Sequence, residues 1–186
     1  MIPERISTKD YILYIAGELF MEKGFQATST REIAEKAQIK QPNLYHHFKT
    51  KEDIYIAVLE NLSAQVKVGL EAIVNDTETD LEASLCDILN YLRDKHPANF
   101  SIMSHDMTYE ISDENHAHLY QLWGSAYLQP LEKLFNHHVP TSPHFSPPEL
   151  ARHFYSVIAP FIQKDNRFKQ EVSVEKVIHL FVHGIL

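Results

Sequence analysis

Residues 41–48 carry side chains whose types and spacing suit hydrogen bonding with nucleic acid. The stretch reads Gln41-Pro42-Asn43-Leu44-Tyr45-His46-His47-Phe48, and on a helix Leu44 and Phe48 fall on one face while the others point elsewhere. Glutamine and asparagine pair bidentately with adenine edges in the major groove, whereas tyrosine and histidine suit phosphate oxygens. The stretch therefore predicts a helix that reads DNA, although an ordinary surface helix would show the same pattern.

The segment before this stretch supplies the elements that would position it. Gly24-Phe25 closes an earlier helix, and Ser29-Thr30-Arg31-Glu32 has the S-x-x-E spacing of a capping box that opens the next one. Only Gln38-Ile39-Lys40 separates that helix from the following helix, which is the turn length of a DNA-binding helix-turn-helix. Pro42 lies in the first turn of the third helix, where its missing N–H has no intrahelical partner anyway.

Together these residues resemble the DNA-binding domain of the tetracycline-repressor (TetR) family of bacterial regulators. The resemblance rests on residues 24–37 and on Leu44-Tyr45-His46-His47-Phe48-Lys49-Thr50-Lys51-Glu52, which fall in register as one composite pattern over roughly the first quarter of the chain. Two positions depart from the family. Gln38 stands where the turn usually has Gly, and Lys40 stands where the family usually has a Ser cap. A non-Gly residue at a position of positive φ costs about 1 kcal/mol, so Gln38 is expected to weaken the turn slightly.

The resemblance also implies roles for individual residues. It implies that Arg31, Gln41 and Asn43 face base edges, and that phosphates are held by Thr30, Tyr45, His47 and Lys51. The family varies at His46, and often has Thr or Ala where this chain has Asn43, so the base that Asn43 reads cannot be copied across. The predicted DNA-binding set is Thr30, Arg31, Gln41, Pro42, Asn43, Tyr45, His46, His47 and Lys51.

The charge is divided unevenly along the 186 residues. The net charge is −8, but residues 1–51 hold eight Lys or Arg against six Asp or Glu, whereas residues 52–186 hold nine against nineteen. The basic excess is thus confined to the segment with the motif, and an acidic remainder would repel DNA elsewhere. A single cysteine, Cys86, and the lack of an apolar run long enough to span a bilayer lead us to expect a soluble, cytoplasmic protein.

Apolar spacing and cap signals predict an all-α fold. A helix is expected from about Ser7 to Lys23, with Ser7 or Thr8 as its cap, and another from a Thr50–Asp53 capping box to about Val74. The first of these has an apolar stripe of Ile12, Ile15, Ala16, Leu19 and Phe20. Further helices are expected from a capping box over residues 79–82, from Phe100 to Tyr109, from Asp113 to about His137 with a kink at Pro130, from a cap at Ser146 and from Ser173, with a loop over residues 138–145. We therefore expect a three-helix helix-turn-helix domain over residues 1–52. The long helix starting at residue 50 would join it to a helical effector-binding and dimerisation domain over residues 53–186.

The last two expected helices are apolar over more than one narrow stripe. The family resemblance implies a two-fold, four-helix interface made by these helices, and a second copy of the chain is the simplest partner for such faces. The alternative is that these faces all belong to the internal core. The predicted interface residues are Phe154, Val157, Ile158, Phe161, Val177, Ile178 and Phe181.

Aromatic, methionine and histidine side chains gather in the middle of the chain. Most can simply be core, but a cavity lined by such groups would suit a small apolar or aromatic effector. The candidate pocket residues are Phe100, Met103, His105, Met107, Tyr109, Tyr120, Trp123 and Tyr127.

A search for catalytic and metal-binding motifs favours neither an enzyme nor a cofactor. His179 and His183 have the i, i+4 spacing of two metal ligands, but no Glu follows His179 as in H-E-x-x-H, so they are interpreted as a polar edge of the last helix and no metal is predicted. The sequence also lacks G-x-S-x-G and a Gly-rich phosphate loop. The chain is not expected to be an enzyme.

These observations favour a homodimeric, ligand-responsive transcriptional repressor. Two recognition helices would enter successive major grooves of a palindromic operator, and an effector would favour a dimer geometry that no longer fits. Three alternatives stay open: an activator or nucleoid-associated factor of the same fold, a regulator that answers to a protein partner and has no small-molecule effector, and a metal-dependent enzyme.

Overall fold

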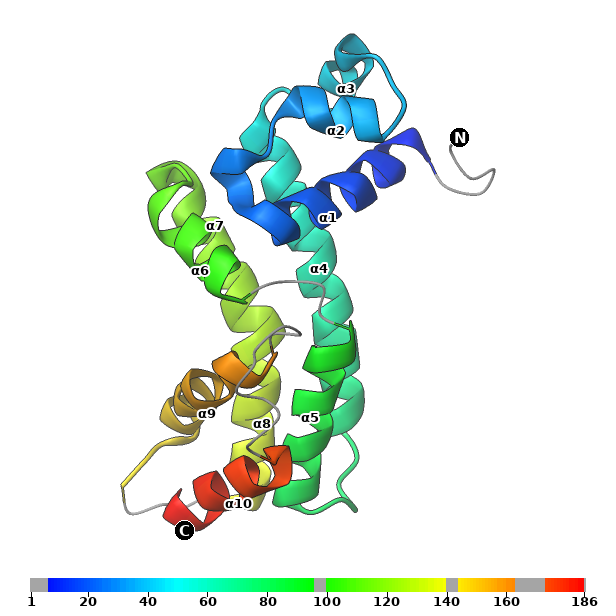
Figure 1. Ribbon diagram of the computed structural model, residues 1–186. Helices are drawn as coiled ribbons and strands as arrows, with labels where there is room; N and C mark the ends of the chain where they lie inside the picture. Colours follow the sequence, from blue (N-terminus) through cyan, green and yellow to red (C-terminus); the bar gives the residue numbers. More distant parts are fainter. Residues whose placement is uncertain (1–6, 96–99, 140–143, 163–172, 186) are drawn as a thin grey trace. The chain divides into compact units, whose positions relative to one another are not determined.

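The computed structural model describes residues 7–95, 100–139, 144–162 and 173–185 (Figure 1). Every regular element in these ranges is a helix, and none of these helices is both long and apolar enough to cross a membrane. The chain divides into two compact units. Unit 1 comprises residues 1–62 and 97–120, and unit 2 comprises residues 63–96 and 121–186. The functional division expected at residue 52 remains a prediction, since these units are defined by packing.

Unit 1 begins with the three helices α1 (Thr8–Ala27), α2 (Thr30–Lys36) and α3 (Gln41–His47). Ser7 caps α1 as predicted, because its hydroxyl accepts the Asp10 N–H at 3.1 Å. The helical conformation breaks at Gly24, where φ is +85°, and a residue with a Cβ would be strained there. The apolar stripe predicted on α1, which includes Ile12, Ala16 and Phe20, is buried.

The long helix α4 (Lys51–Val74) contributes residues to both units. Its start is a complete capping box: the Thr50 N–H donates to Asp53 Oδ2 and the Asp53 N–H donates to Thr50 Oγ1, each at 3.0 Å. Both the cap and the end at Val74 agree with the sequence prediction. Unit 1 is completed by α6 (Phe100–Tyr109), which contacts α1, and by most of α7 (Asp113–Trp123).

Unit 2 holds the remaining helices around its own apolar core. They are α5 (Leu81–Lys95), the π-helical segment η1 (Gly124–Leu128), α8 (Gln129–His138), α9 (Pro147–Ile162) and α10 (Val174–Ile185). Within this unit α8 packs on α9, and α5 packs on α9 and α10 (Figure 1). One helix was expected from Asp113 to about His137 with a kink at Pro130. The irregularity is instead the wider π-helical turn just before Pro130, and Pro130 lies in the first turn of α8.

Two local predictions in unit 2 have different outcomes. The Ser146 cap of α9 is confirmed, because both its N–H, at 2.8 Å, and its hydroxyl, at 2.6 Å, donate to Glu149 Oε2. The box predicted to start at Thr79 is wrong by one residue. Asp80 caps α5 instead, accepting the Ala83 N–H at 2.8 Å, while the Thr79 hydroxyl donates to Asp76. Of the loop predicted over residues 138–145, residues 140–143 lie outside the described residues.

Candidate nucleic-acid interface

Helix α3 is held by two apolar side chains and presents the rest of its surface to solvent. Leu44 is fully buried and Phe48, just past the helix, is nearly so. The side chains of the other positions are exposed, namely Gln41, Pro42, Asn43, Tyr45, His46 and His47. The helix therefore has a polar surface far larger than its anchoring face, as expected from the sequence.

The turn between α2 and α3 contains the two residues that depart from the family pattern, Gln38 and Lys40. Gln38 adopts φ +58°, the left-handed conformation in which the family usually has Gly. The chain then closes back on α2 through the Ile39 N–H, which donates to the Ala34 carbonyl at 3.0 Å. Lys40 precedes α3 without a side-chain capping bond, so the first N–H groups of this helix lack the hydroxyl cap that Ser would supply.

The residues predicted to contact DNA are linked to one another across α2 and α3. The hydroxyls of Thr30 and Tyr45 lie 3.0 Å apart, and Gln41 Nε2 donates to Thr30 Oγ1 at 3.2 Å. Arg31 Nε pairs with Glu35 at 2.9 Å, and 80% of the Arg31 side chain is exposed. Bonds between exposed side chains are weak in water, so these groups can exchange them for a bound anion at little cost.

Lys51 differs from the other predicted phosphate ligands because it is half-buried. Its ammonium donates to the Phe25 carbonyl at 2.8 Å and lies 4.1 Å from the centre of the Phe25 ring. Burial lowers the pKa of Lys51, against the opposing effect of the nearby Glu110 and Asp106 carboxylates. An ammonium has three N–H donors, so the Phe25 bond leaves donors for a phosphate. Lys51 also ties the start of α4 to the end of α1.

Two carboxylates join α6 and α7 to the DNA-binding helices, and sequence reasoning did not identify either. Asp106 on α6 is buried and accepts the Phe25 N–H at 2.8 Å, and burial raises the pKa of this carboxyl. Glu52 on α4 accepts the N–H of Ser112 at 3.0 Å and the Asn115 amide at 2.8 Å at the start of α7. Both contacts join residues more than fifty positions apart, so no local pattern in the sequence could reveal them.

The residues predicted to line one effector pocket are divided between the two units, and the pocket remains a prediction. Five lie in unit 1 and two in unit 2, and the side chain of Phe100 lies outside the described residues. Tyr109 and Tyr120 are exposed on the surface, while Met103 is part of the core. A hollow of about 330 Å³ beside the end of α1 includes only His105 of the predicted set, together with Asp106.

In unit 2 the two predicted pocket residues, Trp123 and Tyr127, form an aromatic cluster with Tyr155. The Trp123 and Tyr127 rings are stacked with their centres 4.3 Å apart, and the Tyr155 ring on α9 lies 5.2 Å from Trp123. Tyr155 also donates its hydroxyl to the Tyr127 carbonyl at 3.1 Å. Tyr155 was absent from the predicted set, because its place beside η1 arises only when α9 folds back on the π-helical segment.

Three of the residues predicted for a dimer interface belong to the core of the single chain. Phe154, Ile158 and Ile178 are fully buried, and the Phe181 ring packs 5.6 Å from that of Phe154. Their burial within the single chain agrees with the alternative, in which these positions belong to the internal core. Large apolar side chains are nevertheless exposed on both helices, with Val157 39% and Leu180 74% accessible.

Comparison with protein families agrees with the geometry of unit 1. Residues 12–58, which include α2, α3 and the turn between them, match the family described as bacterial regulatory proteins, tetR family. Over 29% of its length the chain is 44% identical to the regulator QacR of Staphylococcus aureus, and over 41% it is 42% identical to the repressor KstR2 of Mycolicibacterium smegmatis. It is 32% identical over 40% of its length to the activator FasR of Mycolicibacterium smegmatis.

These matches cover only part of each relative. They span 29% of QacR, 37% of KstR2 and 36% of FasR, so the chain matches about a third of the length of these curated relatives. The likeness to these relatives is therefore limited to that third of their length.

Solved structures extend the likeness to the whole fold. A TetR transcriptional regulator from Legionella pneumophila superposes with a TM-score of 0.78 at 18% identity, over 99% of this chain and all of that chain. The Bacillus subtilis regulator FadR, solved in complex with stearoyl-CoA, superposes with a TM-score of 0.72 at 16% identity, over 95% of this chain and 99% of that chain. At such identities the likeness shows the all-helical fold alone.

Proposed function

We propose that this chain, which belongs to the tetR family of bacterial regulatory proteins, is a sequence-specific DNA-binding transcriptional regulator that acts as a dimer on a palindromic operator. The observation that carries the proposal is the surface of α3. Leu44 and Phe48 fix the helix to its unit, and the polar side chains between and before them are exposed. A short helix presented in this way after a four-residue turn can enter the major groove.

The side chains of α2 and α3 divide into base readers and phosphate ligands. Arg31, Gln41 and Asn43 are proposed to read base edges, because their planar groups pair with two base atoms at once. Thr30, Tyr45, His46, His47 and Lys51 are proposed to hold the backbone and fix the register, with Pro42 shaping the first turn of α3. On binding, the exposed Arg31–Glu35 pair would open to release the guanidinium.

A second copy of the chain is proposed to pack on α9 and α10. The support is the exposure of Val157 and Leu180, which are large apolar side chains with little reason to face water, next to the half-buried Phe161 and Val177. Two copies would set two recognition helices about 34–36 Å apart, one turn of B-form DNA. Such a dimer would bind a site whose two halves are inverted copies of each other.

A small apolar or aromatic effector is proposed to bind beside the Trp123–Tyr127–Tyr155 cluster of unit 2. π-helical turns such as η1 are frequent at functional sites, and stacked rings form a surface that suits an apolar ligand. Effector binding would release the operator only if the ligand prefers the conformation that binds DNA poorly. The relative KstR2 is a repressor, which favours repression, whereas FasR is an activator, so activation by the same architecture is the second candidate.

Selection of bound fragments from random double-stranded DNA tests the DNA-binding role. The chain is expected to enrich a palindrome with half-sites centred one helical turn apart. In the cell, the protein is proposed to act on the nucleoid in the bacterial cytoplasm. A chain that enriches no sequence above the starting pool would contradict the proposal. Enrichment of many short and unrelated sites would instead favour a nucleoid-associated factor.

The effector is tested by the fluorescence of Trp123, the one tryptophan of the sequence. A panel of small apolar and aromatic compounds is titrated against the chain while operator binding is followed in parallel. An effector is expected to change the tryptophan emission and to weaken operator binding at the same concentration. Operator affinity that stays constant across the panel would favour a regulator that responds to a protein partner.

A further inference from the structure

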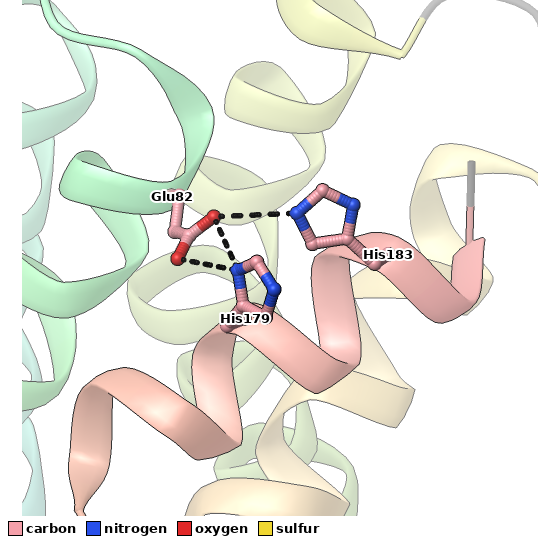
Figure 2. A group of neighbouring side chains, drawn as sticks. All are labelled: Glu82, His179 and His183. Carbon is pink, nitrogen blue, oxygen red and sulfur yellow. Dashed lines mark hydrogen bonds and ion pairs between the residues drawn. The ribbon is translucent and has the colours of Figure 1, made fainter.

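Helix α10 places two histidines against one carboxylate of α5. His179 Nδ1 lies 3.2 Å and 3.3 Å from the two carboxylate oxygens of Glu82, and His183 Nε2 lies 3.8 Å from Glu82 Oε2. The two imidazole rings stand side by side with their centres 4.1 Å apart. Figure 2 shows both rings turned from α10 toward the Glu82 side chain. One nitrogen from each ring and one carboxylate oxygen all lie within 4.8 Å of one another.

This donor set has the chemistry and nearly the spacing of a zinc site. Zinc takes imidazole nitrogen and carboxylate oxygen at about 2.0–2.2 Å, so the donors of a tetrahedral site lie roughly 3.3 Å apart. The Glu82 oxygens lie 3.2 Å and 3.8 Å from the two histidine nitrogens, and all three donors lie within 4.8 Å of one another, so rotations of these exposed side chains would bring the donors to the zinc spacing. All three side chains are accessible to an ion from solvent, with the two imidazoles more than half exposed.

The surroundings of the three residues are acidic. Cys86 lies one turn after Glu82 on α5, and the pKa of its thiol is raised by burial and by the carboxylates of Glu175, Glu82, Asp87 and Asp80. The negative charges of these carboxylates attract a cation to the site formed by the two histidines and Glu82. Magnesium and calcium prefer shells made of oxygen, so the imidazoles favour a transition metal.

We propose that Glu82, His179 and His183 bind one Zn²⁺ ion per chain, with water in the fourth position, and that the ion ties α10 to α5. His179 and His183 supply the i, i+4 pair, and Glu82, which is 97 residues from His179, supplies the third ligand. Zinc is bound by neutral imidazoles, so each coordinating ring nitrogen must carry no proton in the metal-bound site. The site does not depend on the proposed DNA-binding role, because all three residues belong to unit 2.

The proposal is tested by Zn²⁺ competition against a chromophoric chelator, using the full chain after removal of bound metal. The variants are His179→Ala, His183→Ala and Glu82→Gln. The matched control is His118→Ala, because His118 also pairs with a carboxylate, Glu60 at 2.8 Å, but lies outside the three-residue cluster. We expect one tight Zn²⁺ equivalent in the wild type and in the control, and at least tenfold weaker binding in each of the three variants.

Further measurements separate a loss of zinc binding from a loss of folding. Circular dichroism checks that each variant keeps its helices, and Co²⁺ in place of Zn²⁺ gives a visible absorption that reports nitrogen and oxygen ligands directly. Zn²⁺ at a hundred times its Kd is expected to raise the wild-type Tm by roughly 5–10 °C. Folded variants at Glu82, His179 and His183 that bind Zn²⁺ as tightly as the wild type would overturn the proposal. So would a wild-type chain that takes up no tight equivalent.

Discussion

Helices α3 and α10 both expose two histidines, yet they present opposite kinds of surface. On α3 the exposed residues are mostly polar, and two of them bond to the neighbouring helix α2, 11 and 15 residues away in the sequence. On α10 the exposed Leu180 stands next to His179, and the histidines meet a carboxylate from distant α5. Histidine content alone therefore says little about function. The two helices differ in the residues that surround the histidines and in how far away the partners of those residues lie in the chain. These differences are the basis for proposing that α3 reads DNA and that α10 binds a metal and a second chain.

Replacing the buried anchor residue of either helix is expected to have the largest effect on stability. Leu44 in α3 and Ile178 in α10 are both fully buried, so replacing either with Ala should lower the free energy of unfolding by about 3 kcal/mol. Denaturant unfolding measures the loss. Val68→Ala, at an exposed position of α4, serves as the control and should change stability by less than about 0.5 kcal/mol. If Leu44→Ala cost no more than Val68→Ala, the anchoring of α3 described above would be wrong.

The exposed faces should differ in their effect on DNA binding. Gln41→Ala is expected to weaken binding to the selected operator by about 1–3 kcal/mol and to relax specificity at one base pair, because a bidentate reader is lost. His183→Ala, also an exposed polar position, should leave operator affinity unchanged in metal-free buffer. Fluorescence anisotropy with the operator and its single-base variants measures both. Equal losses for the two variants would remove the distinction between the two helices.

The contact that joins α4 to α7 should make the stability of unit 1 depend on pH. Burial alone would raise the pKa of Glu52, but the hydrogen bonds from Ser112 and Asn115 outweigh it and the pKa is lowered from 4.5. This contribution to stability is therefore present above pH 4.5 and lost as the pH falls through the lowered pKa. Glu52→Gln should cost about 1 kcal/mol at pH 7 and much less at a pH well below 4.5, measured by urea unfolding. A cost that is the same at both pH values would contradict this account of Glu52.

The smallest expected effect concerns the turn that carries α3. Because Gln38 holds φ at +58°, Gln38→Gly should raise the free energy of unfolding by about 0.5–1 kcal/mol. Thermal unfolding would show it as an increase of a few degrees in Tm. Gln26→Gly, outside this conformation, is the matched control and should bring no gain. A loss of stability in the turn variant would mean that the Gln38 side chain contributes more than the strain it causes.

Local signals in the sequence predicted several helix starts and the turn before α3 well. The Ser7 and Ser146 caps, the Thr50–Asp53 box and the positive φ at Gln38 all involve residues within a few positions of each other, where backbone preferences decide the structure. Periodicity likewise separated Leu44 and Phe48 from the exposed residues of α3. These features need no knowledge of the rest of the fold.

Long-range features could not be predicted in the same way. Apolar spacing identified Phe154 and Ile178 as buried, but it could not say whether they are covered by the chain itself or by a second copy. Glu82, the carboxylate beside His179 and His183, comes from a helix that is distant in the sequence. The same is true of Asp106, which accepts the Phe25 N–H. Their positions depend on packing between helices, which a single sequence does not specify.

The most direct test of the account places a photo-activated cross-linking amino acid at residue 43 of α3 or at residue 180 of α10. Both positions are exposed, so the probe should perturb neither helix. In the presence of the selected operator, the probe at residue 43 is predicted to form adducts with major-groove bases, and the probe at residue 180 with a second copy of the chain. An absence of DNA adducts at residue 43, on a chain that still binds the operator, would contradict the claim that the exposed face of α3 reads DNA.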